Sequence, residues 1–229
     1  MRREAARHTG IRPEAICVAA SHSHNTPTAA FARGAGEVDP EYKAWAARQA
    51  ATAVILAWGS RRPATLRVGK AEVVGWTINR TRENGPVDTR LSAWSVEDAD
   101  GRPIALLFNF QAHPVVMMGL GPDHLGRDWP GQVTDHLEEA IPGVKALFLQ
   151  GSCGDVNFSA HWHEPNLCDK PGNAVADAVF TAMADARPVE APRVGFAARQ
   201  HVMPTRRWER AEILRDREEA EYRLRTGDT

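Results

Sequence analysis

Hydrophobic and polar positions along the chain follow two patterns, and these patterns predict alternating strands and helices. Short continuous apolar runs bounded by turn residues are typical of buried strands. Such runs cover residues 16–20, 104–110 and 144–150. Longer stretches, several of them rich in alanine, predict helices. These stretches cover residues 41–58, 129–141 and 173–186.

Further segments extend this pattern. Residues 64–80 are strand-like, and residues 91–110 predict a β-hairpin with an Asp-Gly turn. A highly charged helix is predicted near the end of the chain, after residue 203. The sequence therefore predicts a mixed α/β (α+β) fold in which helices flank buried sheet strands.

Polar clusters follow the carboxyl ends of the three short strands. Their sequences are "SHSHN" after residue 20, "QAHP" after residue 110 and "GSCGDVN" after residue 150. Ligands of open α/β sheets bind outside the carboxyl ends of the strands. We therefore expect the three clusters to converge on one site at the carboxyl ends of these strands.

The pair His22 and His24 provides the first candidate metal ligands. In an extended segment, residues two positions apart point to the same side, so both imidazoles can face one cavity. Zinc readily takes neutral imidazole as a ligand. The alternative is a solvated loop in which both rings bond to nearby backbone. His113, which follows the strand 104–110, is either a further ligand or a ring that satisfies a local hydrogen bond.

Other motifs allow both functional and structural interpretations. Backbone N–H groups of "QGSCGDVNF" could receive an oxyanion or phosphate, or the segment is a plain tight turn. Cys153 is a candidate nucleophile, but G-S-C-G is not the G-x-S-x-G elbow, and a small buried cysteine is commoner. Arg80 could clamp a carboxylate or oxyanion, or lie at the surface. Spacing alone favours a helix-capping role for Asp128. For His161 and His163, a solvated or substrate-rim role is favoured over metal binding.

Composition and charge narrow the function classes. The chain has 229 residues, 43% of them hydrophobic, and a formal net charge of −1. No strongly basic face is evident, which argues against nucleic acid as the main partner. No apolar run is long enough for a transmembrane segment, and no secretory signal begins the chain. Three cysteines without C-x-x-C spacing argue against a disulfide framework and leave the cellular compartment open.

Four segments, in order, resemble the N-terminal catalytic domain of the neutral/alkaline non-lysosomal ceramidases and their bacterial relatives. "TGIRPEAICVAASHSHNTPTA" is similar to the family's helix, strand and T-H-T-H-S-G-P segment. "INRTRENGPVDTRLSAWSVEDADGRPIALLFNFQAHPVVM" is similar to its N-R segment followed by a strand and A/C-H-P. "GRDWPGQVTDHLEEAI" and "FLQGSCGDVNF" are similar to its S-A/G-D-x-x-G and G-x-x-G-D-V/I-S/N-P segments. The resemblance implies a partial ceramidase-like catalytic domain in residues 1–203, followed by a charged helix in residues 204–229.

The resemblance also implies roles for individual residues. His22 and His113 would ligate Zn²⁺, and His24 would assist catalysis in the pocket. Arg80 would contact the polar group of the substrate, together with three further substrate-binding positions, Asp128, Gly154 and Asp155. Asn157 stands where the family has a serine, which excludes a serine nucleophile at this position. Asn157 or the backbone N–H groups of the turn would stabilise the oxyanion. The family's remaining zinc ligands, a Glu and a Tyr, come from sequence downstream of the region covered here.

The resemblance thus implies a zinc-dependent hydrolase that cleaves an amide (N-acyl) bond of a small-molecule or lipid substrate with zinc-activated water. Two alternatives stay open. Asn157 could mark a relative that has lost catalysis and binds a ligand in the old pocket. The scaffold could also serve a metal-dependent esterase with a non-ceramide substrate, because no long apolar chain-binding element is evident. Helical patterns that are cut off at both ends lead us to expect a fragment of a longer protein.

Overall fold

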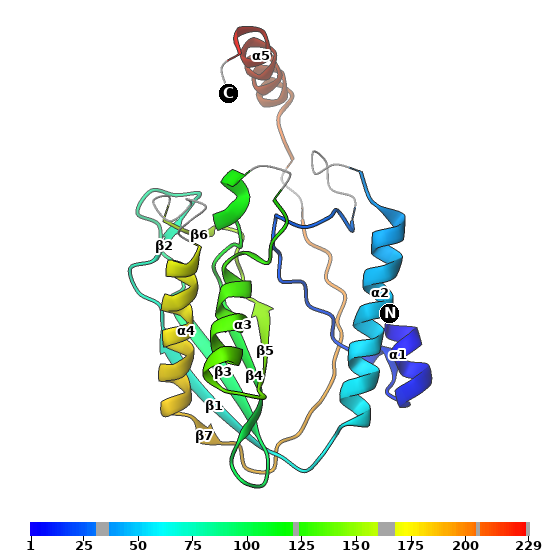
Figure 1. Cartoon of the computed structure of the whole chain (residues 1–229). Helices are drawn as coiled ribbons and strands as arrows, with labels where there is room; N and C mark the ends of the chain where they lie inside the picture. The colour runs from blue at the N-terminus through cyan, green and yellow to red at the C-terminus, as the bar shows by residue number, and fades with distance from the viewer. Residues whose placement is uncertain (31–36, 121–123, 160–167, 205–206, 228–229) are drawn as a thin grey trace. The chain divides into compact units, whose positions relative to one another are not determined.

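A five-stranded sheet forms the centre of the computed structural model (Figure 1). Its strands are β1 (Thr65–Glu72), β3 (Arg90–Glu97), β4 (Pro103–Phe110), β5 (Lys145–Gln150) and β7 (Arg187–Pro188). Their order is β5-β4-β3-β1-β7, and every neighbouring pair is antiparallel except β4 and β5. Because β4 and β5 are parallel and Phe110 pairs with Gln150, the two carboxyl ends lie side by side.

The structure describes residues 1–30, 37–120, 124–159, 168–204 and 207–227, in two units. The first unit, Met1–Gly195, contains the sheet, and the second is Phe196–Thr229. The second unit holds α5 (Arg210–Thr226), which begins with a capping box formed by Glu209 and Glu212. The charged terminal helix therefore forms, whereas the domain boundary expected after residue 203 stays a prediction.

Two helices, α3 (Asp128–Ala140) and α4 (Asp169–Ala184), pack on the sheet (Figure 1). A separate pair, α1 (Arg2–Thr9) and α2 (Pro40–Gly59), packs together around a small buried cluster of Ala5, Ile16 and Ala51. Two 3₁₀ turns, η1 (Pro13–Ala15) and η2 (Val116–Leu120), lie in the connections. Among the described residues, no helix is both long and apolar enough to cross a membrane.

A second, two-stranded sheet is hydrogen-bonded to the residues just after β4. It pairs β2 (Thr77–Asn79) antiparallel with β6 (Val156–Phe158). The backbone N–H of His113, just past β4, donates to the carbonyl of Val156 at 2.9 Å. The small sheet therefore stands beside the carboxyl ends of the parallel pair, where the sequence places the polar clusters.

Aromatic side chains join the start of α3 to the strands that lead to the site. Trp129 is fully buried, and its ring centroid lies 4.9 Å from that of Phe148, 5.5 Å from Phe158 and 6.0 Å from Phe110. All three contacts are edge-to-face, a geometry that contributes about 0.5–1.5 kcal/mol per pair beyond area burial. The cluster fixes the first turn of α3 against β4, β5 and β6.

The fold class predicted from the sequence is confirmed: strands of a central sheet are flanked by helices, and the hairpin 91–110 forms β3 and β4. Two element boundaries differ from prediction. The strand-like stretch 64–80 is divided into β1 and β2, with Gly75 between them at φ +84°, a conformation that favours glycine. The helix expected over 173–186 begins earlier, at Asp169.

The strand predicted over residues 16–20 is wrong. Ile16 is buried against α1 and α2, but residues 17–20 are exposed and are paired with no strand in the described part of the chain. A cavity of about 290 Å³ lies between this segment and β5, with Ala19 and Ser21 on one side and Ala146 and Phe148 on the other. An apolar run alone does not make a strand, because the ladder also needs a neighbouring backbone within hydrogen-bonding distance.

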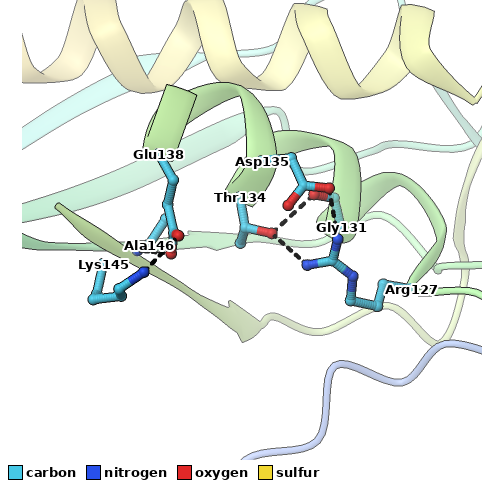
Figure 2. Close-up of polar contacts among 7 residues, drawn as sticks. All are labelled: Arg127, Gly131, Thr134, Asp135, Glu138, Lys145 and Ala146. Atoms are coloured by element: carbon cyan, nitrogen blue, oxygen red, sulfur yellow. Dashed lines mark hydrogen bonds and ion pairs between the residues drawn. The ribbon is translucent and has the colours of Figure 1, made fainter. Parts of the chain in front are cut away.

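A carboxylate from α3 covers part of the edge of β5 that faces away from β4 (Figure 2). Glu138 accepts the backbone N–H of Ala146 at 3.0 Å and pairs with Lys145 at 2.9 Å. Nearer the start of α3, Arg127 pairs with Asp135. The two contacts of Glu138 hold α3 along β5 and satisfy an outward-facing N–H that an open sheet edge would leave exposed, whereas the Arg127–Asp135 pair lies within the first turns of α3.

Replacing Glu138 by Gln should lower the free energy of unfolding at neutral pH by about 0.5–1 kcal/mol, because it removes a charge-assisted bond and an ion pair. Lys145 and the backbone N–H of Ala146 hold the pKa of Glu138 below its ordinary value. The contribution is therefore present above the unfolded pKa and is lost as the pH falls through the folded one. Urea unfolding from pH 7 down to about pH 3 should show the two proteins converging at the acidic end. Glu139→Gln, on the same helix, is the matched control for the loss of one negative charge and should leave stability at pH 7 close to that of the wild type.

Gly69 of β1 should tolerate no side chain. A Cβ built there would lie 1.7 Å from the carbonyl oxygen of Ala182 in α4, which is backbone and cannot rotate away. Gly69→Ala should therefore cost about 3 kcal/mol in thermal or urea unfolding. Gly59→Ala, where a Cβ meets nothing within 4 Å, should change stability little. Equal stability of the two variants would contradict the close approach of α4 to β1.

Candidate metal centre

Three imidazoles converge at the carboxyl ends of β4 and β5. The Nε2 atom of His113 lies 3.0 Å from that of His22 and 3.1 Å from that of His24. The three ring centroids are 4.7 to 5.2 Å apart. His113 is buried, whereas His22 and His24 are exposed. One face of the cluster is thus anchored in the fold, and the other is open to solvent.

The segment that carries His22 and His24 is held by side-chain bonds of its own residues. Ser23 Oγ donates to the carbonyl of Gly126 at 2.8 Å, and the Asn25 amide donates to the carbonyl of His124 at 3.1 Å. The backbone at His22 has φ +67°, a strained conformation for a residue with a side chain. Both rings reach His113 from this bent backbone, not from the extended strand that the sequence predicts.

A backbone hydrogen bond fixes the tautomer of His113. Its Nδ1 lies 3.1 Å from the carbonyl oxygen of Cys153. A carbonyl oxygen can only accept, so Nδ1 carries the proton and donates it. Burial lowers the pKa of His113, the hydrogen bond to the Cys153 carbonyl acts to raise it, and the charges of Arg80, His22 and His24 lower it further. The net shift of the pKa is downward, which keeps the ring neutral near pH 7. Nε2 of His113 therefore presents a lone pair to His22 and His24, as a metal-ligating histidine does.

The donor atoms fit a zinc ion. Two imidazole nitrogens bound tetrahedrally at about 2.0–2.1 Å stand about 3.3 Å apart. The Nε2 separations of 3.0 and 3.1 Å are close to this value. A single lone pair on His113 also cannot serve two imidazole N–H donors well, whereas a cation shared by His22 and His113 uses a lone pair from each of these two rings. His24 as a whole is exposed, but partial desolvation of its ring, followed by the charges of His22 and Arg80, lowers its pKa, which likewise favours the neutral ring.

Cys153 is a further donor beside the imidazoles. Ligand atoms of His22, His113 and Cys153 all lie within 4.8 Å of one another. The thiol is partly buried, and this burial raises its pKa. From the sequence, Cys153 was a candidate nucleophile or buried residue and not a ligand. The signal that could have identified it is its place in the turn after β5, opposite the histidine that follows β4.

Arg80 lies at the rim of the cluster and is exposed. Its Nε donates to the carbonyl of Gly154 at 3.0 Å, and its backbone N–H donates to the carbonyl of Asp155 at 2.8 Å. The Asp155 carboxylate in turn accepts the Asn79 amide at 2.9 Å. Gly154 and Asp155 thus position Arg80, and their predicted contact with substrate stays a prediction, as does that of Arg80.

Asp128 is buried at the start of α3, with φ +56°. Its carboxylate accepts the backbone N–H groups of Trp129 at 2.7 Å and Met117 at 2.9 Å. It therefore ties η2 to the first turn of α3. The helix-capping role expected for Asp128 is wrong, because Asp128 is the first residue of α3 and the N-cap is Arg127, which makes no side-chain cap bond. The negative charge of Asp128 also acts to raise the pKa of His24. Its expected role in substrate binding is untested.

Asn157 lies in β6 opposite Ile78 of β2. Its side-chain oxygen is buried and has no hydrogen-bond partner among the described residues. A buried acceptor without a partner is costly and calls for an explanation such as a bound ligand. The orphan atom is an acceptor, and an oxyanion would instead require the amide nitrogen. The predicted role of Asn157 at an oxyanion stays a prediction, while His161 and His163 lie outside the described residues.

The fold resembles that of neutral ceramidases. The crystal structure of the neutral ceramidase from Pseudomonas aeruginosa matches 63% of this chain with a TM-score of 0.55 and 18% sequence identity. A structure described as a ceramidase complexed with C2 matches 60% of the chain with a TM-score of 0.52 and 16% identity. The matches span 26% and 25% of those longer chains. No protein-family model and no curated protein matches the sequence. The resemblance noted in the sequence is thus supported at the level of the fold.

His113→Ala should abolish the lone pair on which the imidazoles converge. Loss of hydrogen-bonded partners around metal ligands already costs about 10–100-fold in affinity, so loss of His113 should weaken Zn²⁺ binding about 100-fold or more. Calorimetric titration with Zn²⁺ measures this effect, and circular dichroism shows whether the variant is folded. His136→Ala is the control, because His136 pairs with Asn173 on the outer side of α3 and α4. Unchanged Zn²⁺ affinity in folded His113→Ala would remove His113 from the ligand set.

Proposed function

We propose that this chain forms the metal-binding part of a zinc-dependent hydrolase that cleaves an amide bond in an N-acyl substrate. The observation that carries the proposal is the convergence of His22, His24 and His113, with His113 held as the tautomer that a metal ligand requires. The similarity of the fold to neutral ceramidases supports a hydrolase.

His22 and His113 would hold the zinc ion. A zinc ion bound there supplies a Lewis acid that polarises a carbonyl and lowers the pKa of a bound water to about 7. His113 contributes a fixed direction, because its Nδ1–H is bonded to the backbone of the turn after β5. His22 contributes from the exposed side of the cluster and can adjust its ring to the ion.

His24 would move the proton. Its pKa is lowered by burial and by neighbouring positive charge, so its ring is neutral and able to accept a proton at working pH. Its Nε2 lies 3.1 Å from that of His113, next to the place where the reacting carbonyl would bind. The same nitrogen could then return the proton to the departing amine.

Arg80 and Asn157 would hold the polar part of the substrate. The bond from Arg80 Nε to the carbonyl of Gly154 fixes the guanidinium while its terminal N–H groups extend beyond it. The unpartnered oxygen of Asn157 would accept an N–H or O–H of the bound molecule. Neither role requires Asn157 to act as a nucleophile.

A second candidate function is binding without turnover. The observation that favours it is the side chain of Asn157. Its buried oxygen has no hydrogen-bond partner among the described residues and could accept one from a ligand, but the side chain has no nucleophilic atom. In this case the site would hold its metal, bind a lipid or sugar derivative and release that derivative unchanged.

The test uses the protein at its full native length, reconstituted with Zn²⁺ and offered a panel of N-acyl amides, esters and sphingolipids. We expect amide hydrolysis that is lost with a chelator and restored by Zn²⁺. His24→Ala should lower kcat by about 100-fold or more, with Zn²⁺ still bound, because the proton carrier is gone. Ester hydrolysis alone would replace the amidase with an esterase. Saturable binding of a panel member without any product would establish the second candidate.

A further inference from the structure

We infer that Cys153 is a direct ligand of the metal, so that His22, His113 and Cys153 supply a three-residue donor set within this chain. The inference rests on the metal centre of the proposed function, but not on its substrate or reaction. It assigns a role to a residue for which the sequence offered only a nucleophile or a buried thiol.

The distances place the sulfur within reach of a shared ion. Zinc binds thiolate sulfur at about 2.3 Å and imidazole nitrogen at about 2.0–2.1 Å, which puts sulfur and nitrogen about 3.5 Å apart in a tetrahedral site. The donor atoms of the three residues lie within 4.8 Å of one another. A cysteine moves its sulfur by rotation about one bond, and His22 is exposed and can shift toward the ion. Small side-chain adjustments therefore close the site.

The backbone holds Cys153 against the buried imidazole. The carbonyl oxygen of Cys153 accepts both the Nδ1–H of His113 at 3.1 Å and the backbone N–H of Val156 at 3.2 Å. The residue that fixes the tautomer of His113 thus also carries the candidate third donor. A ligand whose backbone carbonyl is held by two hydrogen bonds suits a preorganised metal site.

Local charge also suits an anionic ligand at this position. Arg80 donates to the carbonyl of Gly154, the next residue, and so places a positive charge beside the turn. Binding would replace the S–H bond of Cys153 by a sulfur–metal bond and release the proton to solvent. The thiolate would then neutralise part of the charge of the cation and favour Zn²⁺ or Co²⁺ over Mg²⁺ or Ca²⁺.

Three protein ligands leave a fourth position of the ion open, which is the arrangement of catalytic zinc sites. His24 then stays free for the proton transfer described above. This donor set lies wholly within the 229 residues of the chain.

The experiment is a titration of the 229-residue chain with Co²⁺, followed by absorption spectroscopy. Thiolate coordination gives a sulfur-to-cobalt charge-transfer band in the near ultraviolet, which imidazole ligands do not produce. We expect the band in the wild type and in Cys17→Ser, a matched control at an exposed cysteine outside the cluster. In Cys153→Ser the band should vanish and Co²⁺ affinity should fall at least about tenfold.

A second measurement needs no variant. Zn²⁺ should protect Cys153, but not Cys17, from alkylation by iodoacetamide, as mapped by mass spectrometry of the wild type. Bound Co²⁺ without the band, a band that survives in Cys153→Ser, or folded chain that binds no Co²⁺ would each overturn the inference. A charge-transfer band in a protein that hydrolyses nothing would leave Cys153 as a ligand and refute the hydrolase. If the protein hydrolyses its substrate but Zn²⁺ leaves the alkylation rate of Cys153 unchanged, the hydrolase is supported and Cys153 is not a ligand.

Discussion

The hydrogen bond from Nδ1 of His113 to the carbonyl of Cys153 is the interaction on which the site depends. It leaves the lone pair of His113 on Nε2, where His22 and His24 meet it. Without this bond the ring could exchange tautomers, and Nε2 would carry a proton toward two other imidazoles. A single backbone carbonyl thus decides whether the cluster can accept a cation or only contains crowded rings.

The parallel pairing of β4 and β5 makes that bond possible. Parallel strands end at the same edge, so the residue after one strand can contact the turn after the other. The aromatic cluster around Trp129 then fixes α3 over the same edge, and α3 carries Asp128 toward the histidines. The chemistry of the site therefore follows from one strand pair and the helix packed beside it.

Much of the fold follows from local pattern in the sequence. The hairpin of β3 and β4, the helix α3 and the strand β5 each have a strong local signal, and each forms near its expected residues. The strand expected at 16–20 does not form, because pairing depends on a partner backbone that no local pattern reveals. The three polar clusters could be expected at the ends of predicted strands.

Finer features of the site could not be predicted in the same way. The tautomer of His113 depends on a carbonyl 40 positions away, and the proximity of Cys153 depends on the shape of a turn. The hydrogen bond from the Asn79 amide to Asp155 likewise joins the end of β2 to the turn before β6. Such contacts follow from the relative placement of strands, which periodicity does not encode.

Among the described residues, the segment that carries His22 and His24 is hydrogen-bonded to the residues just before α3 and to Pro114 after β4, and not to the strand β5. It is separated from β5 by a cavity, and His22 must meet a partner 91 positions away in the sequence. Closing so long a loop costs conformational entropy, against which the bonds of Ser23, His24 and Asn25 act. A cation that binds the closed arrangement alone would stabilise it by about 2.7 kcal/mol at a free concentration of 100 times its Kd. Metal supply would then control not only the reactivity of the histidines but also whether the N-terminal segment stays docked on the folded chain, and with it the chain's resistance to proteolysis.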